Sequence, residues 1–118
     1  MTPAAFRKLA LSFPEASEGA HGGHPDFRVG GKLFASLGYP DKTCATILLS
    51  PEEQDAFTQE DPDAFERVGG YWGSKGATTV HLKAAKTAPV KSALHAAWRR
   101  KAPKSLAAKL DEAKPARR

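Results

Sequence analysis

Residues 69–82, GGYWGSKGATTVHL, contain the glycines and the lysine that phosphate-binding loops use. A P-loop requires G-x-x-x-x-G-K-[ST] between a strand and a helix, so that backbone amides and the helix dipole face the phosphates. Counted from Gly69, Ser74 stands where the second glycine belongs, and Gly76 stands where the hydroxyl residue belongs. The alternation that follows predicts a strand instead of a helix. We therefore expect no nucleotide-hydrolysing P-loop here.

Trp72, in the same stretch, has two interpretations. In the first, the flanking glycines form a turn that seats the indole ring against one end of the core. In the second, an exposed Trp72 stacks on a base or sugar while Lys75 contacts a phosphate. The glycine-framed turn is the favoured interpretation. Trp98, the second tryptophan, lies on an apolar helical stripe and is predicted to be core.

Two histidines in HGGHPD, residues 21–26, suggest a metal site or a small-molecule pocket together with Asp26. In a regular strand His21 and His24 would point to opposite faces, so they converge only if the two glycines between them bend the chain. A closed site would also need a distant ligand such as His81. We expect a structural turn here and no metal site.

No local pattern predicts catalysis. Cys44 lies in the middle of a predicted strand without the signature of a reactive thiolate, and we expect a buried, inert thiol. Ser36 is also in mid-strand and not on a nucleophile elbow. The acidic residues Glu52, Glu53 and Asp55 begin a helix, where they suit the helix dipole and form no acid–base pair. The sequence therefore predicts a protein that is not an enzyme and has no cofactor.

Charge is distributed unevenly along the chain. Residues 1–82 hold 7 Lys/Arg and 11 Asp/Glu, a net charge of −4, whereas residues 83–118 hold 11 Lys/Arg and 2 Asp/Glu, a net charge of +9. A basic segment on a mildly acidic body is typical of a surface that binds nucleic acid. The alternative is a solvated helix face followed by a disordered basic tail.

The first half of the chain predicts one helix followed by antiparallel strands. Thr2 is a candidate N-cap of a helix whose apolar residues share one face up to Phe13. Strands are predicted within residues 19–49, with EGAHGGH as a short, glycine-weakened edge strand. Gly30-Gly31 predicts a two-residue hairpin, because both positions can take positive φ without steric cost.

The second half predicts short helices, a strand and a long helix. Ser50 and Glu53 form a capping box. A second short helical piece is expected over DAFERV, residues 63–68, and a strand over residues 77–83. The last clear helix is expected over residues 87–101, with a short helical turn beyond it. Its predicted buried stripe is Val90, Leu94, Ala97 and Trp98, and its predicted exposed row is Lys91, His95 and Arg99.

This order of elements predicts an α+β, two-layer fold in which an antiparallel sheet packs on the N- and C-terminal helices. Residues 1–106 are expected to form one domain, and residues 107–118 a basic tail that is partly helical or disordered. The single cysteine suits a reducing compartment, and we find neither a signal-peptide pattern nor an apolar run long enough for a membrane span. We expect a cytoplasmic monomer that does not contact a membrane.

Four segments in order resemble those of the MmcQ/YjbR family, and together they run from about Phe6 to Leu106. They are FRKLALSFPEASEGAHGGHPDFRVGGKLFASL, LSPEEQDAF, GGYWGSKGATTVHL and HAAWRRKAPKSL. The resemblance implies a fold similar to that of the bacterial frataxin CyaY, with two helices on a curved antiparallel sheet. Family members are commonly labelled DNA-binding. In one departure, Ala77 stands where many relatives carry an aromatic residue, which weakens the case for a broad aromatic platform.

The frataxin-like fold also raises iron delivery as an alternative. That chemistry needs a ridge of carboxylates, since iron is held by hard oxygen ligands. The first predicted helix instead shows Arg7 and Lys8 and has no acid before Glu15. We therefore do not expect the iron-binding surface to accompany the fold.

The sequence favours a protein that binds nucleic acid, DNA in the family's label, through a basic C-terminal helix surface and mainly through phosphate contacts. The alternative is a non-enzymatic protein-interaction or small-ligand module on the sheet face, centred on His21, His24, Arg28 and Trp72. The candidate nucleic-acid-binding residues are Lys75, Lys91, Arg99, Arg100, Lys101, Lys104 and Trp72.

Overall fold

The computed structural model describes residues 1–112, apart from the side chains of His21 and of residues 109–112. Helix α1, Pro3–Leu11, begins where the sequence predicts, because the Thr2 side chain accepts a hydrogen bond from the amide of Ala5 at 3.0 Å. Its apolar side packs inward, with Phe6 fully buried. Residues 113–118 of the predicted tail lie outside the described residues.

One six-stranded sheet forms the centre of the molecule. Every adjacent pair is antiparallel, and the order across the sheet is β1-β2-β3-β4-β6-β5. The predicted edge strand is confirmed as β1. The bounds are Ser17–His21 (β1), His24–Val29 (β2), Lys32–Leu37 (β3), Cys44–Leu48 (β4), Phe65–Arg67 (β5) and Ala77–His81 (β6).

Glycine pairs make the two tight turns at the start of the sheet. Gly30-Gly31 takes φ values of 58° and 78° between β2 and β3, which confirms the predicted hairpin. Gly22-Gly23 takes φ values of 58° and 83° and joins β1 to β2 in a second hairpin. The histidine-flanked glycines are therefore a structural turn, as expected.

The middle of the chain differs from the sequence prediction at one element. Helix α2, Pro51–Glu60, begins with the predicted capping box. The next segment was expected to be helical, and this prediction is wrong: β5 takes its place. The alternation that puts Phe65 in the core and Glu66 outside is satisfied by pairing along β6, which offers a free edge. A three-residue strand is too short to show its period in sequence.

The C-terminal part consists of three helices joined by β6 and short connections. Helix α3, Gly70–Ser74, is a single turn where a glycine-framed turn was expected. Helix α4, Thr87–Lys101, has the predicted bounds, and α5, Lys104–Glu112, crosses the expected domain boundary at residue 106. No helix within residues 1–112 is long and apolar enough to cross a membrane.

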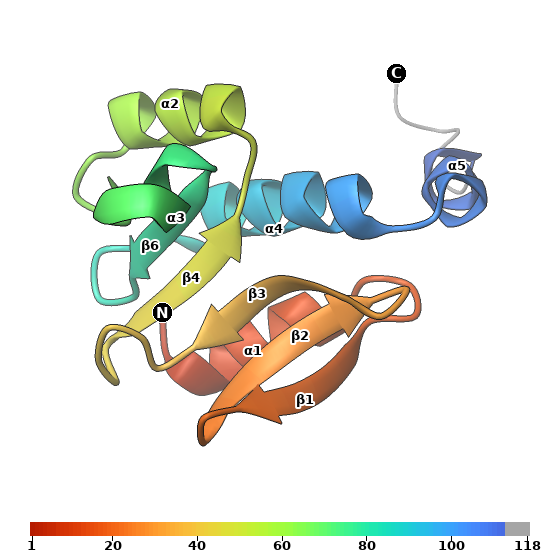
Figure 1. The fold of residues 1–118 in the computed structure, drawn as a ribbon, viewed down its shortest axis with the longest axis horizontal. Coiled ribbons are helices and arrows are strands. Elements are labelled where there is room, and N and C mark those ends of the chain that lie inside the picture. Colours follow the sequence, from red (N-terminus) through yellow and green to blue (C-terminus); the bar gives the residue numbers. More distant parts are fainter. Residues whose placement is uncertain (113–118) are drawn as a thin grey trace.

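Helices α1 and α4 cover one face of the sheet (Figure 1). The predicted α+β, two-layer fold is confirmed. Trp98 is fully buried between these layers, as expected, and its indole N–H donates to the Pro14 carbonyl at 3.1 Å. His95 was expected to be exposed, and this prediction is wrong. Its ring stacks on Phe13 with the centroids 5.9 Å apart, because the end of α1 lies beside α4.

Candidate nucleic-acid interface

The end of α4 and the start of α5 form a basic groove. Ala102 has an extended backbone, with φ −69° and ψ 147°, because the following proline disfavours the helical region. The chain therefore turns before α5 begins at Lys104. The turn leaves a groove of about 440 Å³ between the two helices. Its lining residues are Arg99, Arg100, Ala102, Lys104, Ala107 and Ala108.

A second group of cations adjoins this groove. The pKa of Lys101 is lowered, first by partial burial and then by the charges of Arg100 and Lys32. Lys32 is the first residue of β3, directly after the β2–β3 turn. This turn packs against the α4–α5 connection: a Cβ on Gly30 would lie 3.1 Å from the Pro103 ring. The structure thus adds Lys32 to the predicted basic set. The sequence shows the hairpin but gives no sign that its turn contacts the distant proline.

The basic residues also suit the helix on which they lie. Arg99, Arg100 and Lys101 occupy the last turn of α4, where positive charge interacts favourably with the negative end of the helix dipole. Lys91 is exposed two turns earlier, about 12 Å along the axis at 1.5 Å per residue. The structure therefore places five of the predicted residues on α4 and at the start of α5.

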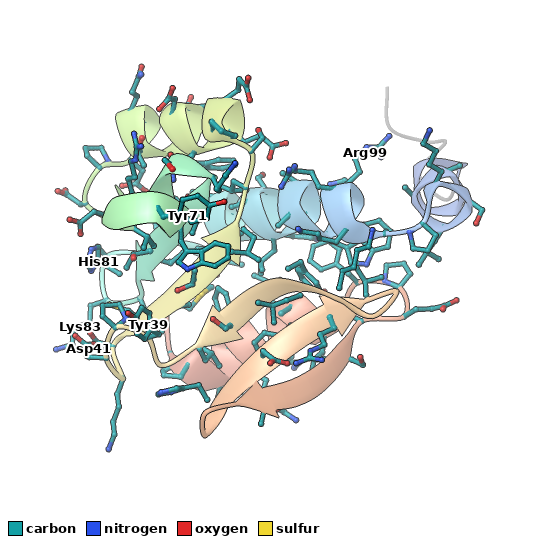
Figure 2. The ribbon with its side chains drawn as sticks, viewed as in Figure 1. Tyr39, Asp41, Tyr71, His81, Lys83 and Arg99 are labelled. Atoms are coloured by element: carbon teal, nitrogen blue, oxygen red, sulfur yellow. The ribbon has the colours of Figure 1, made fainter. Side chains whose placement is uncertain are left out.

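Trp72 and Lys75 lie elsewhere, on and just after α3. In Figure 2, Tyr71 on α3 and Arg99 on α4 are well separated along the molecule. The Trp72 side chain is 68% exposed, so the prediction that it packs against the core is wrong. The reason is Gly73, where a Cβ would lie 1.5 Å from the Val68 carbonyl oxygen: the glycine faces the protein, and the aromatic residues before it face solvent.

The exposed aromatic residues of α3 form a small cluster with a lysine. The rings of Tyr71 and Trp72 meet edge to face with the centroids 5.2 Å apart. The Lys75 ammonium lies 5.4 Å from the Tyr71 ring centroid, within the range of a cation–π interaction. Tyr39, in the β3–β4 loop, is the other large hydrophobic residue exposed in the described chain. This cluster offers flat apolar surface next to a positive charge.

The buried amide of Gln54 on α2 anchors α3. Its Nε2 donates to the carbonyls of Gly73 at 3.0 Å and Ala77 at 2.8 Å, so one side chain joins α2, α3 and β6. Gly76 then turns the chain with φ 112°, and a Cβ there would lie 1.8 Å from the Leu49 carbonyl oxygen. Only glycine fits this turn.

The histidine region on β1 and β2 offers weaker support for a binding site than the basic groove does. Arg28 donates to Asp26 through Nε at 3.1 Å and Nη2 at 3.0 Å, and this hydrogen bond is the main reason for the raised pKa of Arg28. The carboxylate partly neutralises the guanidinium. His24 is exposed, and no group of His, Cys, Asp and Glu side chains within the described residues is arranged to hold a metal ion.

Comparisons with known proteins assign the fold and the family relationship. A family model described as YjbR matches residues 11–100. The structure is similar to the crystal structure of Deinococcus radiodurans protein DR2400, described as carrying a DUF419 domain, with a TM-score of 0.69 and 17% sequence identity. The similarity covers 84% of this chain and 77% of that one. No functionally curated protein matches the chain.

Proposed function

The chain belongs to the YjbR family, and from that premise we propose that it binds nucleic acid, most simply duplex DNA, at the basic groove between α4 and α5. One observation carries the proposal. Arg99, Arg100 and Lys104 line a groove whose other described lining residues are alanines. A polyanion gains most where several cations gather on one surface.

The depressed pKa of Lys101 supports the same conclusion. The shift means that burial and the neighbouring charges of Arg100 and Lys32 disfavour the protonated ammonium. A phosphate placed among these cations would relieve that repulsion and raise the pKa again. The repulsion between Lys101 and its cationic neighbours is unfavourable in the free protein, and an anionic ligand would reduce it.

The expected mode of binding is contact with the phosphate backbone, with little reading of bases. Six cations can contribute, and each phosphate contact lowers the slope of log K against log salt by about 0.9 for duplex DNA and about 0.7 for a single strand. We therefore expect slopes of about −5 and about −4, respectively. The six are Lys32, Lys91, Arg99, Arg100, Lys101 and Lys104.

Fluorescence anisotropy of labelled duplex and single-stranded DNA across a salt series tests the proposal. The double variant Arg100→Gln/Lys104→Gln should bind more weakly and show a slope shallower by about 2. The matched control is Lys42→Gln/Lys83→Gln, which removes two exposed charges from other segments and should leave the slope unchanged. Absence of binding at low salt, or an equal loss in the control, would contradict the proposal.

The α3 cluster favours a second candidate, a protein-interaction or small-ligand module that uses exposed aromatic residues instead of the basic groove. Fragment screening by NMR distinguishes this candidate. The indole N–H signal of Trp72 should shift when a ligand binds, whereas that of the fully buried Trp98 should not. A wild-type protein that binds no nucleic acid but shows this selective shift would favour the second candidate over the first.

A further inference from the structure

A cysteine, a histidine and a glutamate lie side by side on three neighbouring strands, on the face that α1 and α4 leave uncovered. Cys44 on β4 is the register partner of His81 on β6, and Glu66 on β5 pairs with Thr79, two residues before the histidine. Successive strand residues point to opposite faces. The residues next to them in sequence, Ala45, Val80 and Phe65, are in the core.

The three side chains form a chain of hydrogen bonds in which Cys44 contacts His81 and His81 contacts Glu66. The Cys44 Sγ lies 3.7 Å from the His81 Nδ1, and the His81 Nε2 lies 2.7 Å from the Glu66 Oε1. An ionised carboxylate only accepts, so the Nε2 carries a hydrogen and donates it to Glu66. The Nδ1 of the neutral ring is then an acceptor, positioned to receive the thiol proton. A nucleophile, a base and a group that orients the base therefore follow one another.

The backbone keeps the cysteine close to the histidine. The amide of Cys44 donates to the Asp41 carbonyl, and its carbonyl accepts from the Gly38 amide, so neither bonds to His81. Non-hydrogen-bonded pairs of an antiparallel ladder bring their side chains closer than hydrogen-bonded pairs do. Thr43 and Asp41 also adjoin the thiol. The Thr43 Oγ1 lies 3.7 Å from the sulfur and donates to the Asp41 carboxylate, and a hydrogen bond with Cys44 contributes to the lowered pKa of Asp41.

Access to the sulfur is narrow. Cys44 is only 2% exposed, whereas the side chains of His81 and Glu66 are 39% and 65% exposed. In Figure 2, His81 lies near Tyr39 and Asp41 at one end of the sheet. A reactant must therefore approach past the histidine, and a bulky one will not reach the sulfur. The site suits a small, uncharged electrophile.

We propose that Cys44 is a thiol that small hydroperoxides oxidise, with His81 as the base and Glu66 as the positioning residue. The His81 Nδ1 takes the thiol proton, and the thiolate attacks the terminal peroxide oxygen. An S–O bond forms as the O–O bond breaks, and the leaving oxygen takes the proton back from Nδ1. The products are a sulfenic acid and an alcohol, or water from hydrogen peroxide.

The fate of the sulfenic acid follows from the sequence. The chain has a single cysteine, so an intramolecular disulfide cannot form. Reduction must come from an external thiol, which first forms a mixed disulfide and is then displaced by a second thiol. The inference is independent of nucleic-acid binding, because it rests on residues of β4, β5 and β6 and on none of the basic groove.

Mass spectrometry of protein treated with hydrogen peroxide tests the inference. Peptide mapping should locate one added oxygen on Cys44, and Cys44→Ser provides the background from oxidation of Met1. His81→Gln should slow the reaction by roughly a hundredfold, the size of a general-base contribution. Glu66→Gln should slow it by a smaller factor without changing the thermal midpoint, and Glu60→Gln, an exposed carboxylate on α2, should have no effect.

The dependence of the Cys44 reaction rate on the size of the reagent provides a second test. A large aromatic disulfide should react with Cys44 much more slowly than hydrogen peroxide does in folded protein, and quickly after unfolding. Absence of sulfenic acid in protein whose thiol is intact after unfolding would overturn the inference. An oxidation rate in folded His81→Gln equal to that of the wild type would also overturn it, since the histidine would then have no part in the reaction.

Discussion

Replacing Gln54 with leucine tests how α3 and its exposed aromatic residues are held to the fold. The substitution keeps the side-chain volume and a good helix former in α2, but it removes the amide that bonds to Gly73 and Ala77. Gln54 is only 2% exposed, so water does not compete for these hydrogen bonds. We expect a less stable protein with an unchanged fold.

The magnitude follows from what each carbonyl retains. The Gly73 carbonyl still accepts from the amide of Gly76, and the Ala77 carbonyl still accepts from that of Val68. Neither oxygen is left without a donor, so the full penalty for a buried, unsatisfied group does not apply. Two hydrogen bonds at about 1 kcal/mol each give a loss of about 2 kcal/mol in the free energy of unfolding. For a chain of this size that lowers the thermal midpoint by about 8 °C.

Urea denaturation followed by circular dichroism measures this loss. Gln59→Leu is the matched control, because Gln59 is exposed on the same helix, and its replacement should change stability by less than about 0.5 kcal/mol. NMR should also show larger chemical-shift changes in α3 than in α1. A loss in Gln54→Leu no greater than in the control would refute the reasoning that this amide joins α2 to α3.

Two further predictions concern tryptophan exposure and a carboxylate. Iodide should quench the fluorescence of Trp98→Phe, which retains the exposed Trp72, much more than that of Trp72→Phe, which retains the buried Trp98; equal quenching would contradict the exposures. The pKa of Asp41 is lowered, first by the hydrogen bond from the Thr43 side chain and then by that from its amide. The stabilising effect of Asp41 is therefore present above its unfolded pKa and lost as pH falls through its lower folded pKa. Thr43→Val should raise the midpoint of the Asp41 carboxyl in an NMR titration, and an unchanged midpoint would show that the hydroxyl is not the main cause.

Much of the fold could be predicted from local signals. Caps and glycine pairs act within a few residues, so Thr2, Ser50 and Gly30-Gly31 define their elements without help from the rest of the chain. The long helix α4 shows its period over 15 residues, and Trp98 falls on the buried side as expected. Errors occurred where an element is too short to show a period, as in β5 and α3.

Trp72 shows how a close backbone contact by a neighbouring residue can expose a large apolar side chain that would usually be buried. Large apolar residues next to glycines are often buried, and the sequence favoured that outcome. In the structure it is Gly73 that meets the backbone of Val68, and a one-turn helix cannot place the glycine and the tryptophan before it on the same side. Neither the contact nor its consequence can be deduced from neighbouring residues.

The candidate sites also combine features that the sequence shows with contacts that only the folded structure creates. The sequence by itself determined the basic character of the C-terminal segment, since charge is a property of composition, and most of the helices and strands, since their signals are local, with β5 as an exception. Only the tertiary structure brought Lys32 to the basic groove and placed His81 between Cys44 and Glu66. These residues are far apart in the chain, and their proximity depends on which strands pair and in which register, which is decided by the packing of the whole sheet.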